Sequence, residues 1–355
     1  MTGLGRRHFL LSGVATLGFA AAGGPARAAE VSEAARGLTS GALTVDMHSH
    51  AGRFNRNLPA FEPVAEPMRA GGLAVACLAI VADSPTHRVF PDRRIHPTRE
   101  PEPGELYAWS KSRFTRLLQM IQQQGLTIVG NTAQLRAAPR TGPAVIVAAE
   151  GADFLENSLE RLDEARTVFG LRHLQLVHYR HNELGDIQTE DPAYGGLTDF
   201  GVEVIRACNR LGIVVDVAHG TSELVKRAAA ATARPLILSH TALTTTPRPH
   251  TRLITPDHAR LVAATGGVIG VWPPVSQFPT LDHMAYGMAQ LAEVVGVDHV
   301  GLGSDLNGLT GPSLLTSYRD LPLLAQALLA RGFAAADVGK ILGGNYARVF
   351  TATVG

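Results

Sequence analysis

Four histidines and one glutamate each follow a short apolar run of the sequence. Imidazole and carboxylate groups are common ligands of zinc, so side chains of these types gathered in one place would bind a metal ion. A single histidine after a strand is more often a hydrogen-bonded loop residue, but a His-x-His pair with three further candidates is difficult to obtain by chance. The candidates are His48 and His50 after 43–47, Glu150 after 145–149, His219 after 213–217, and His240 after 236–238.

Eight apolar runs alternate with segments of helical periodicity, a pattern typical of α/β proteins with a parallel sheet. In a closed parallel barrel the carboxyl ends of the strands meet at one mouth, which would bring the candidate ligands together. An open doubly wound sheet would spread them along an edge, so ligands from the first, third, fifth and sixth strands favour closure. We predict an α/β fold, a (β/α)8 TIM-type barrel with additional C-terminal helices. The expected strands are 43–47, 74–80, 144–149, 173–177, 213–217, 236–239, 267–272 and 300–303, and the expected helices are 110–124, 158–169, 199–211, 222–231, 256–265, 281–295, 321–329 and 337–342.

The first 28 residues are typical of a cleaved twin-arginine export signal. Arg6 and Arg7 precede an apolar stretch that runs to Ala22, and Ala26-Arg27-Ala28 satisfies the small-x-small cleavage rule. An N-terminal membrane anchor is the alternative, but the apolar stretch is too short to span a bilayer. The sequence therefore predicts a signal peptide at 1–28, one domain at 29–355, no stable membrane anchor, and export to the periplasm or the extracellular space.

The charge of the chain argues for a small-molecule partner. The formal net charge is +1, and loss of residues 1–28 removes three arginines and no acid, which gives 1 − 3 = −2. No run of lysine and arginine interleaved with aromatic residues is present, so we expect neither nucleic-acid nor membrane-surface binding. The two cysteines, Cys77 and Cys208, lie in apolar patterns and are expected to be small buried side chains rather than a disulfide.

The segment 84–105 is rich in proline, arginine and histidine and shows no periodicity. Loops of this length in compact domains are usually functional lids or disordered, and this one would lie over the mouth of the barrel. We expect its two histidines, His87 and His96, to be solvated rather than to bind metal.

A set of short motifs extends over nearly all of 29–355. In combination they resemble the membrane (renal-type) dipeptidase family, metal-dependent barrel enzymes of the amidohydrolase superfamily. The motifs are Asp46-Met47-His48, Glu150-Gly151 with Asn157-Ser158-Leu159, Leu176-Val177-His178 with Asn182, Gly196-Leu197-Thr198-Asp199-Phe200-Gly201, Asn209-Arg210-Leu211-Gly212 with Asp216 and His219, Ser239-His240, Gly301 to Gly308, and Gly343-Gly344-Asn345.

The resemblance implies two zinc ions bridged by Glu150 and a hydroxide. By the same resemblance His48 would bind one ion, and His219 and His240 the other. Two neighbouring ions lower the pKa of the shared water and polarise the scissile carbonyl group.

The family also implies roles for residues beside the metal ligands. Asp305, after the eighth expected strand, matches the acid/base that moves a proton from the water to the leaving amine. His178 matches the residue that stabilises the developing oxyanion. Arg252 matches an arginine that binds the substrate carboxylate through paired N–H donors, although Arg248 lies close by in the sequence.

The sequence departs from the family at two positions. The family usually has aspartate two residues after the first histidine, whereas this chain has His50, which is the pattern of many other amidohydrolases. A neutral ligand in place of an anionic one makes the site one unit more positive, which should acidify bound water and weaken the first ion. The second departure is Asn307, where the family often has aspartate.

The expected function is zinc-dependent hydrolysis of dipeptides, including L,D-dipeptides, and the family implies a homodimer. One alternative is another amidohydrolase activity, such as that of a lactonase, esterase or deacetylase, for which a C-terminally amidated dipeptide would be as good a substrate as the free acid. A second alternative is a non-catalytic metal-binding envelope protein, but such a protein would have no use for the acid/base carboxylate of Asp305.

Overall fold

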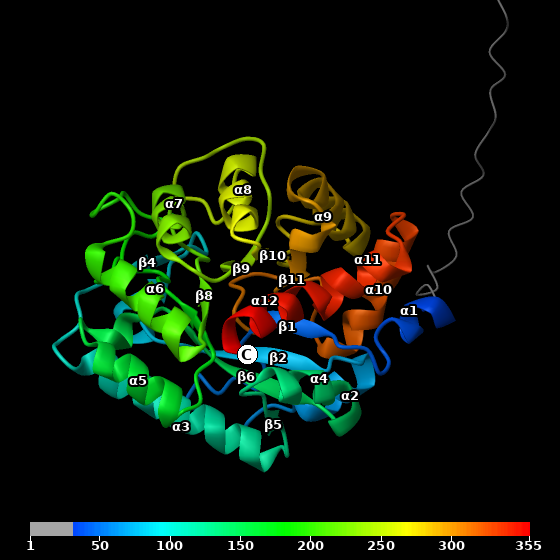
Figure 1. Ribbon diagram of the computed structural model, residues 1–355, viewed down its shortest axis with the longest axis horizontal. Coiled ribbons are helices and arrows are strands. Elements are labelled where there is room, and N and C mark those ends of the chain that lie inside the picture. Colours follow the sequence, from blue (N-terminus) through cyan, green and yellow to red (C-terminus); the bar gives the residue numbers. More distant parts are fainter. Residues whose placement is uncertain (1–30) are drawn as a thin grey trace, which may run out of the picture. The chain divides into compact units, whose positions relative to one another are not determined.

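The eight expected strands form one parallel sheet in the computed structural model, which describes residues 31–355 (Figure 1). Main-chain hydrogen bonds from His50 N to Leu306 O and from Asp305 N to His48 O, both 2.9 Å long, join the first strand to the segment after the last. The sheet is therefore a nearly closed barrel, and the open doubly wound alternative is wrong. In the order in which they pair, the strands are β1 (Val45–Ser49), β2 (Val75–Val81), β6 (Ala144–Glu150), β7 (His173–Gln175), β8 (Val214–Asp216), β9 (Ile237–Thr241), β10 (Val268–Val271) and β11 (Val300–Leu302), and the short β5 (Thr127–Ile128) pairs with β6 outside this order.

Helices surround the strands (Figure 1). Three of them, α6, α7 and α9, have the predicted bounds. The sequence did not predict α1, α2, α4 and α12; in α12, Val349, Thr351 and Thr353 are β-branched residues with low helix propensity, so tertiary packing decides its structure. The helices are α1 (Glu33–Gly37), α2 (Ala65–Gly71), α3 (Glu105–Gln123), α4 (Thr132–Thr141), α5 (Leu159–Thr167), α6 (Asp199–Leu211), α7 (Ser222–Ala231), α8 (Pro256–Ala264), α9 (Leu281–Val295), α10 (Leu321–Ala330), α11 (Ala335–Gly339) and α12 (Asn345–Val354), with a π-helical turn at Lys340–Gly344.

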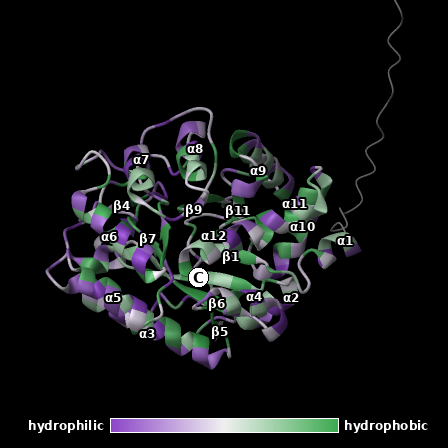
Figure 2. Ribbon diagram, viewed as in Figure 1, coloured by the Kyte–Doolittle hydropathy of each residue, from purple (hydrophilic) through white to green (hydrophobic). Residues whose placement is uncertain are grey.

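Alternate residues of each strand pack on opposite sides of the barrel wall. On β2, Cys77 packs inside the barrel with residues of α12, whereas Leu78 packs outside against the surrounding helices. Both sides of a parallel barrel are buried, which explains why most strand residues are apolar (Figure 2). Arg348 of α12 donates a hydrogen bond to Gly266 O, just before β10, so α12 lies at the amino ends of the strands. The mouth at the carboxyl ends is left for the candidate ligands.

The segment 84–105 contains a β-hairpin, although its sequence shows no periodicity. A 3-10 turn (Ser84–Thr86) leads into β3 (His87–Val89), which pairs antiparallel with β4 (Ile95–Pro97). The prediction that its histidines are solvated is wrong for His87, whereas the side chain of His96 is 30% exposed. The side chain of His87 is only 13% exposed and lies 3.2 Å from the carboxylate of Asp83, and His96 Nδ1 lies 2.6 Å from Glu190 Oε1. These contacts hold the hairpin against the mouth of the barrel.

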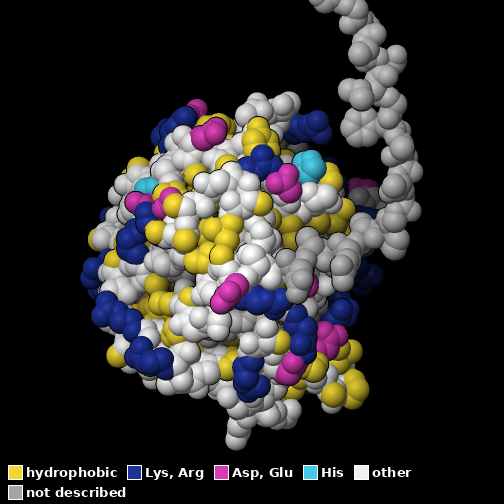
Figure 3. Space-filling model, turned by 90° about the vertical axis from the view of Figure 1, so that its right-hand side faces the viewer, with side chains coloured by type: hydrophobic (Ala, Val, Ile, Leu, Met, Phe, Trp, Pro, Cys, Tyr) yellow, Lys and Arg dark blue, Asp and Glu magenta, His cyan; other side chains and the backbone are white. Residues whose placement is uncertain are grey.

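Residues 31–355 form one compact unit. The predicted signal peptide at 1–28 lies outside the described residues. Within the described part, no helix combines the length and the apolar character that crossing a membrane requires. Cys77 and Cys208 are both buried, and neither forms a disulfide. On the face that carries α10 and α11, basic and acidic side chains are mixed (Figure 3).

Candidate metal centre and catalytic site

Glu150, the last residue of β6, is the centre of the site. Its side chain is 3% exposed, and its two carboxylate oxygens face five imidazole rings from four segments of the chain. All four histidines that the sequence selected as ligands are among them, together with His178. The distances from the ring Nε2 atoms to the nearest carboxylate oxygen are 3.3 Å for His48, 3.2 Å for His50, 3.3 Å for His178, 3.4 Å for His219 and 3.6 Å for His240.

Two β-bulges place His48 and His240 at this centre. Between Asp46 and Ser49, β1 has two residues opposite one residue of β2. In the same way, β9 has Ser239 and His240 opposite the single residue Gly270 of β10. An extra residue reverses the alternation of side chains along a strand. We infer that each bulge turns a histidine, which regular alternation would direct outside the barrel, toward Glu150.

Two buried aspartates hold the strand ends in register. Asp46 Oδ1 accepts hydrogen bonds from the backbone N–H groups of His48 and Ser304, at 3.3 and 2.8 Å. Asp216 Oδ1 accepts equivalent bonds from Ala218 and Ser239, at 2.9 and 3.0 Å. Each aspartate therefore ties together two segments that carry site residues, His48 with Asp305 and His219 with His240.

Hydrogen bonds on the far side of three rings orient them toward Glu150. Nδ1 of His50 lies 2.9 Å from Ala79 O and 3.1 Å from Nδ2 of Asn55, so Nδ1 is engaged on the far side of the ring and Nε2 faces Glu150. Nδ1 of His178 lies 2.7 Å from Asp83 Oδ1, and Nδ1 of His240 lies 2.9 Å from the hydroxyl of Ser239.

The electrostatics of the cluster favour the metal-binding form of His219, His240 and Glu150, but not that of His48. Burial holds the pKa values of His219 and His240 well below the usual value, so both rings are neutral. Burial also raises the pKa of Glu150, but the charges of His178 and His48 outweigh this effect and hold it well below its usual range. Burial lowers the pKa of His48, but Glu150 outweighs it and raises that pKa to about 9. A cation at Glu150 would have to displace this proton.

Asp305 lies beside the cluster, as the sequence predicts for the acid/base. Its Oδ1 atom is 3.5 Å from Nε2 of His50, and burial raises its pKa.

Three residues at the mouth have a left-handed backbone conformation. Asp305 has a φ angle of 47°, and His219 has one of 68°, a conformation that is costly for most residues. Asn307 also has a left-handed φ angle, 68°, which asparagine tolerates well. Its side chain contacts Glu62 at 3.4 Å.

Arg252 lies at the outer edge of the site, next to Tyr179 and Trp272. Its Nη1 atom donates to Gln188 Oε1 at 2.8 Å, and its Nη2 atom donates to His240 O at 3.3 Å. Its Nε atom has no hydrogen-bond partner among the described residues. Arg248, the alternative that the sequence left open, is an exposed residue that precedes Arg252 in the same loop.

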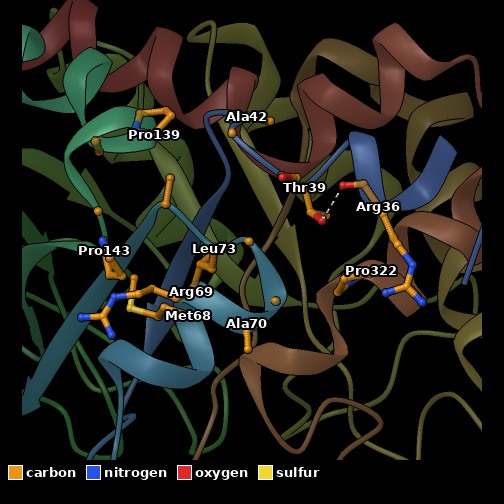
Figure 4. A pocket seen from close by; sticks show the side chains of 17 residues that line it. Arg36, Thr39, Ala42, Met68, Arg69, Ala70, Leu73, Pro139, Pro143 and Pro322 are labelled. Atoms are coloured by element: carbon orange, nitrogen blue, oxygen red, sulfur yellow. Dashed lines mark hydrogen bonds between the residues drawn. The ribbon is translucent and has the colours of Figure 1, made fainter. Parts of the chain in front are cut away.

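Two neighbouring cavities open at this end of the barrel. The smaller one, about 190 Å³, is lined by Glu150, four of the five histidines around it and Asp305. The larger one, about 590 Å³, shares Tyr179, Trp272 and Asp305 with it and also contains Arg252. A third cavity, of about 390 Å³, lies at the amino ends of β2 and β6 (Figure 4). Its lining includes Arg36 and Arg69 but no histidine, cysteine or acidic residue, so its chemistry does not resemble that of the mouth.

Four residues of the site were not predicted from the sequence: Asp83, His87, Tyr179 and Trp272. Asp83 and Trp272 follow the second and seventh strands, so the rule that selected the metal ligands would also have found them. The buried indole N–H of Trp272 has no hydrogen-bond partner among the described residues. His87 could not be found in this way, because it reaches the cavity from the hairpin.

The cluster fits a metal centre. Three groups of potential ligand atoms at the mouth contain Glu150 or Asp305, and Asp83, His87 and His178 form a fourth; the atoms of each group lie within 4.8 Å of one another. The Nε2 atoms of the neutral His219 and His240 lie only 3.0 Å apart, close enough for both rings to bind the same ion. The first three groups are His48, Glu150 and His240; His48, His50 and Asp305; and Glu150, His178 and His219.

The fold and this cluster define a (β/α)8 barrel protein with a candidate metal centre at the carboxyl ends of its strands. The chain belongs to the membrane dipeptidase family (peptidase family M19), whose family model matches residues 67–354. The resemblance inferred from the motifs is thus confirmed, and membership of a metallopeptidase family implies metal binding.

Curated relatives include dipeptidase aclJ of Aspergillus oryzae, 31% identical over 191 residues, and dipeptidase verJ of Clonostachys rogersoniana, 30% identical over 186 residues. Each match covers 51% of this chain, and 44% and 48% of the respective relative. The chain therefore spans about half the length of the curated relatives it matches.

Solved structures share the fold at lower identity. The probable dipeptidase PvdM of Pseudomonas aeruginosa has a TM-score of 0.76 at 20% identity, covering 90% of this chain and 97% of its own. A metallo peptidase of Rhodobacter sphaeroides, solved with a phosphinate mimic of the dipeptide L-Ala-D-Ala, has a TM-score of 0.75 at 22% identity, covering 87% and 99%. These similarities support the TIM-barrel fold.

Proposed function

We propose that this protein is a zinc-dependent dipeptidase that hydrolyses the peptide bond of small dipeptides, including L,D-dipeptides. The observation that carries the proposal is the convergence of five imidazoles on Glu150, with Asp305 in the same cavity. The family and the names of the curated relatives support the reaction. The ligand of the Rhodobacter sphaeroides structure supports the inclusion of a D-residue at the carboxyl end.

His48, His50, Glu150, His219 and His240 would hold two zinc ions, with Glu150 bridging them. When bound there, the ions would supply Lewis-acid activation of a water and of the scissile carbonyl group. The neutral state of His219 and His240 suits this role, because imidazole binds a metal only without its second proton. His50 replaces an anionic ligand of the family by a neutral one, so the centre carries one more unit of positive charge.

The other residues of the cavity move protons and hold the substrate. Asp305 accepts a proton from the attacking water and donates it to the leaving amine, and its raised pKa helps it to act in both directions. His178, fixed by Asp83, presents Nε2 to the developing oxyanion. Arg252 binds the carboxylate of the dipeptide, and its remaining N–H groups provide the donors.

Hydrolysis of a panel of L,L- and L,D-dipeptides by the zinc-loaded protein, with and without chelator, tests this function. We expect turnover that chelator abolishes. In the Glu150→Gln variant we expect loss of activity together with lowered metal content, because the bridging carboxylate is gone. An active and fully metallated Glu150→Gln variant would contradict the proposal. Turnover of C-terminally amidated dipeptides at the same rate as the free acids would favour a lactonase, esterase or deacetylase activity instead.

Export and dimerisation remain predictions. We propose that residues 1–28 direct the protein out of the cytoplasm through the twin-arginine pathway. Recovery of the protein from the periplasm or the medium, and its loss from there when Arg6 and Arg7 are replaced by lysine, would support this proposal. Retention of the wild-type protein in the cytoplasm would contradict it. The native mass of the purified protein tests the homodimer.

A further inference from the structure

The larger cavity at the mouth is strongly basic, although the chain as a whole is nearly neutral. Four arginines line it, Arg93, Arg94, Arg248 and Arg252, against two acidic residues, Asp92 and Asp305. Asp305 belongs to the catalytic cavity, where it faces His50. With residues 1–28 removed, the formal net charge of the chain is 1 − 3 = −2. The positive charge is therefore concentrated where a substrate would enter.

These arginines come from two loops that the fold brings together. Arg93 and Arg94 lie in the turn of the β3–β4 hairpin, and Arg248 and Arg252 lie between β9 and α8. Arg94 Nη2 donates a hydrogen bond to His250 O at 2.8 Å, which joins the two loops. Among the described residues, Arg93, Arg94 and Arg248 form no ion pair with a carboxylate. Their charges are free to act on a ligand.

The position of Arg93, Arg94 and Arg248 relative to Arg252 indicates which end of the substrate these three arginines would contact. Arg252, the proposed partner of the substrate carboxylate, lines the larger cavity, whereas Glu150 and the histidines line the smaller one. A dipeptide with its scissile bond at Glu150 and its carboxylate at Arg252 would therefore extend its C-terminal residue toward Arg94 and Arg248. A side chain on that residue would lie among their guanidinium groups.

We infer that the enzyme prefers dipeptides with an acidic C-terminal residue, aspartate or glutamate, whose side-chain carboxylate is bound by the basic surface formed by Arg93, Arg94 and Arg248. This inference rests on the proposed dipeptidase function. A guanidinium group pairs with a carboxylate through two parallel N–H donors, and it keeps its charge at any physiological pH. A cavity lined by charges of one sign also raises the local concentration of oppositely charged substrate.

The test compares isosteric substrates that differ only in charge. The zinc-loaded protein is assayed at low ionic strength with L-Ala-L-Glu and L-Ala-L-Gln, and with the reversed pair L-Glu-L-Ala and L-Gln-L-Ala. We expect kcat/KM to be about tenfold higher for L-Ala-L-Glu than for L-Ala-L-Gln, with little difference within the reversed pair. Added salt should reduce this preference, because it screens exposed charges.

Variants assign the preference to these arginines. In the Arg94→Gln, Arg248→Gln double variant, the Glu/Gln ratio of kcat/KM should fall toward 1. The matched control is Arg88→Gln, which removes an exposed arginine of the same hairpin that does not line the cavity. An equal loss of the ratio in the control would overturn the inference, because total charge would then explain the preference.

The outcomes separate this inference from the proposed function. If both L-Ala-L-Glu and L-Ala-L-Gln are hydrolysed at the same rate, the dipeptidase function stands and the acidic preference is wrong. If the zinc-loaded protein hydrolyses none of the four dipeptides and no L,D-dipeptide of the panel, the proposed function fails and the preference fails with it; if it hydrolyses only L,D-dipeptides, the function stands and the preference is wrong. An unchanged ratio in the double variant also overturns the assignment.

Discussion

The orientation of His178 depends on one buried carboxylate. Asp83 accepts from Nδ1 of His178 at 2.7 Å and from the backbone N–H of Tyr179 at 2.9 Å. Burial raises the pKa of Asp83, but the charges of His178 and His87 outweigh it and hold the pKa below its usual range, so the group is ionised. An ionised carboxylate accepts a hydrogen bond from Nδ1 and favours the doubly protonated ring of His178, whose Nε2–H group faces Glu150 at 3.3 Å and can donate to an oxyanion.

Replacing Asp83 by asparagine should therefore reduce catalysis without removing the metal. An amide carries no charge, so it would no longer stabilise a positively charged His178 ring, and Nε2–H would be a weaker donor to the oxyanion. We expect kcat to fall about 10- to 100-fold in Asp83→Asn, with a smaller change in KM and unchanged zinc content. Steady-state kinetics and elemental analysis measure these quantities. His87→Gln is the control, since it removes the other partner of Asp83 and keeps the Asp83–His178 bond; an equal fall of kcat in both variants would contradict the role of that bond.

At the scale of single elements, the sequence predicted the eight strands because both of their sides are buried and apolar. The rule that strand ends converge then located His48, His50, Glu150, His219 and His240 together. The sequence did not predict the bulges of β1 and β9, because a bulge is a property of pairing with a neighbouring strand. These bulges nevertheless decide which way two of the candidate ligands, His48 and His240, point.

Other elements depend on long-range contacts that local patterns do not record. The β3–β4 hairpin is held by contacts of Arg94 with His250 and of His96 with Glu190, both distant in the sequence. Helix α12 is stabilised by packing at the amino ends of the strands, where Tyr346 and Phe350 join the core inside the barrel. Propensity is a weak predictor for such segments. The basic surface could not be predicted either, because it depends on where the hairpin lies.

The loop after β11 has no space for a side chain at Gly308. A Cβ atom there would lie 1.9 Å from Asp305 Oδ1 and 2.6 Å from Cδ2 of His50. Gly308→Ala must therefore displace the Asp305 carboxylate. A displacement of about 1 Å in a catalytic group can cost on the order of 100-fold in rate, so we expect kcat to fall by about that factor. Dipeptide kinetics measure it.

Gly311 is the matched control for this variant. It lies in the same loop, and the nearest atom to a Cβ added there is 4.0 Å away, on Arg93. Gly311→Ala should keep most of the activity toward L-Ala-L-Ala. If Gly308→Ala is as active as Gly311→Ala, then the exact position of Asp305 is less important than its proposed acid/base role requires.

In the molecule as a whole, the two ends of the barrel have different functions. At the amino ends of the strands, α12 covers an apolar interior that includes Tyr346 and Phe350. At the carboxyl ends, buried charges cluster around Glu150, and several of them have strongly shifted pKa values. The apolar core inside the barrel thus lies toward one end and the candidate site lies at the other, as is usual for this fold. A bound cation would compensate the buried charge of Glu150 and link β6 to the other strands that carry candidate ligands.

Removal of metal should therefore lower the stability of the whole barrel. The proposed ligands come from β1, β6, β8 and β9 and the residues that follow them, and the unfolded chain does not hold them together. A ligand present at 100 times its Kd stabilises the native state by about 2.7 kcal/mol, which corresponds to a shift in Tm on the order of 5 °C for a chain of this size. Thermal unfolding with and without chelator, followed by zinc addition, measures the shift. In Glu150→Gln the shift should be much smaller. An unchanged Tm in wild-type protein that elemental analysis shows to have lost its zinc would mean that the barrel is fully formed without metal and that the cluster serves chemistry alone.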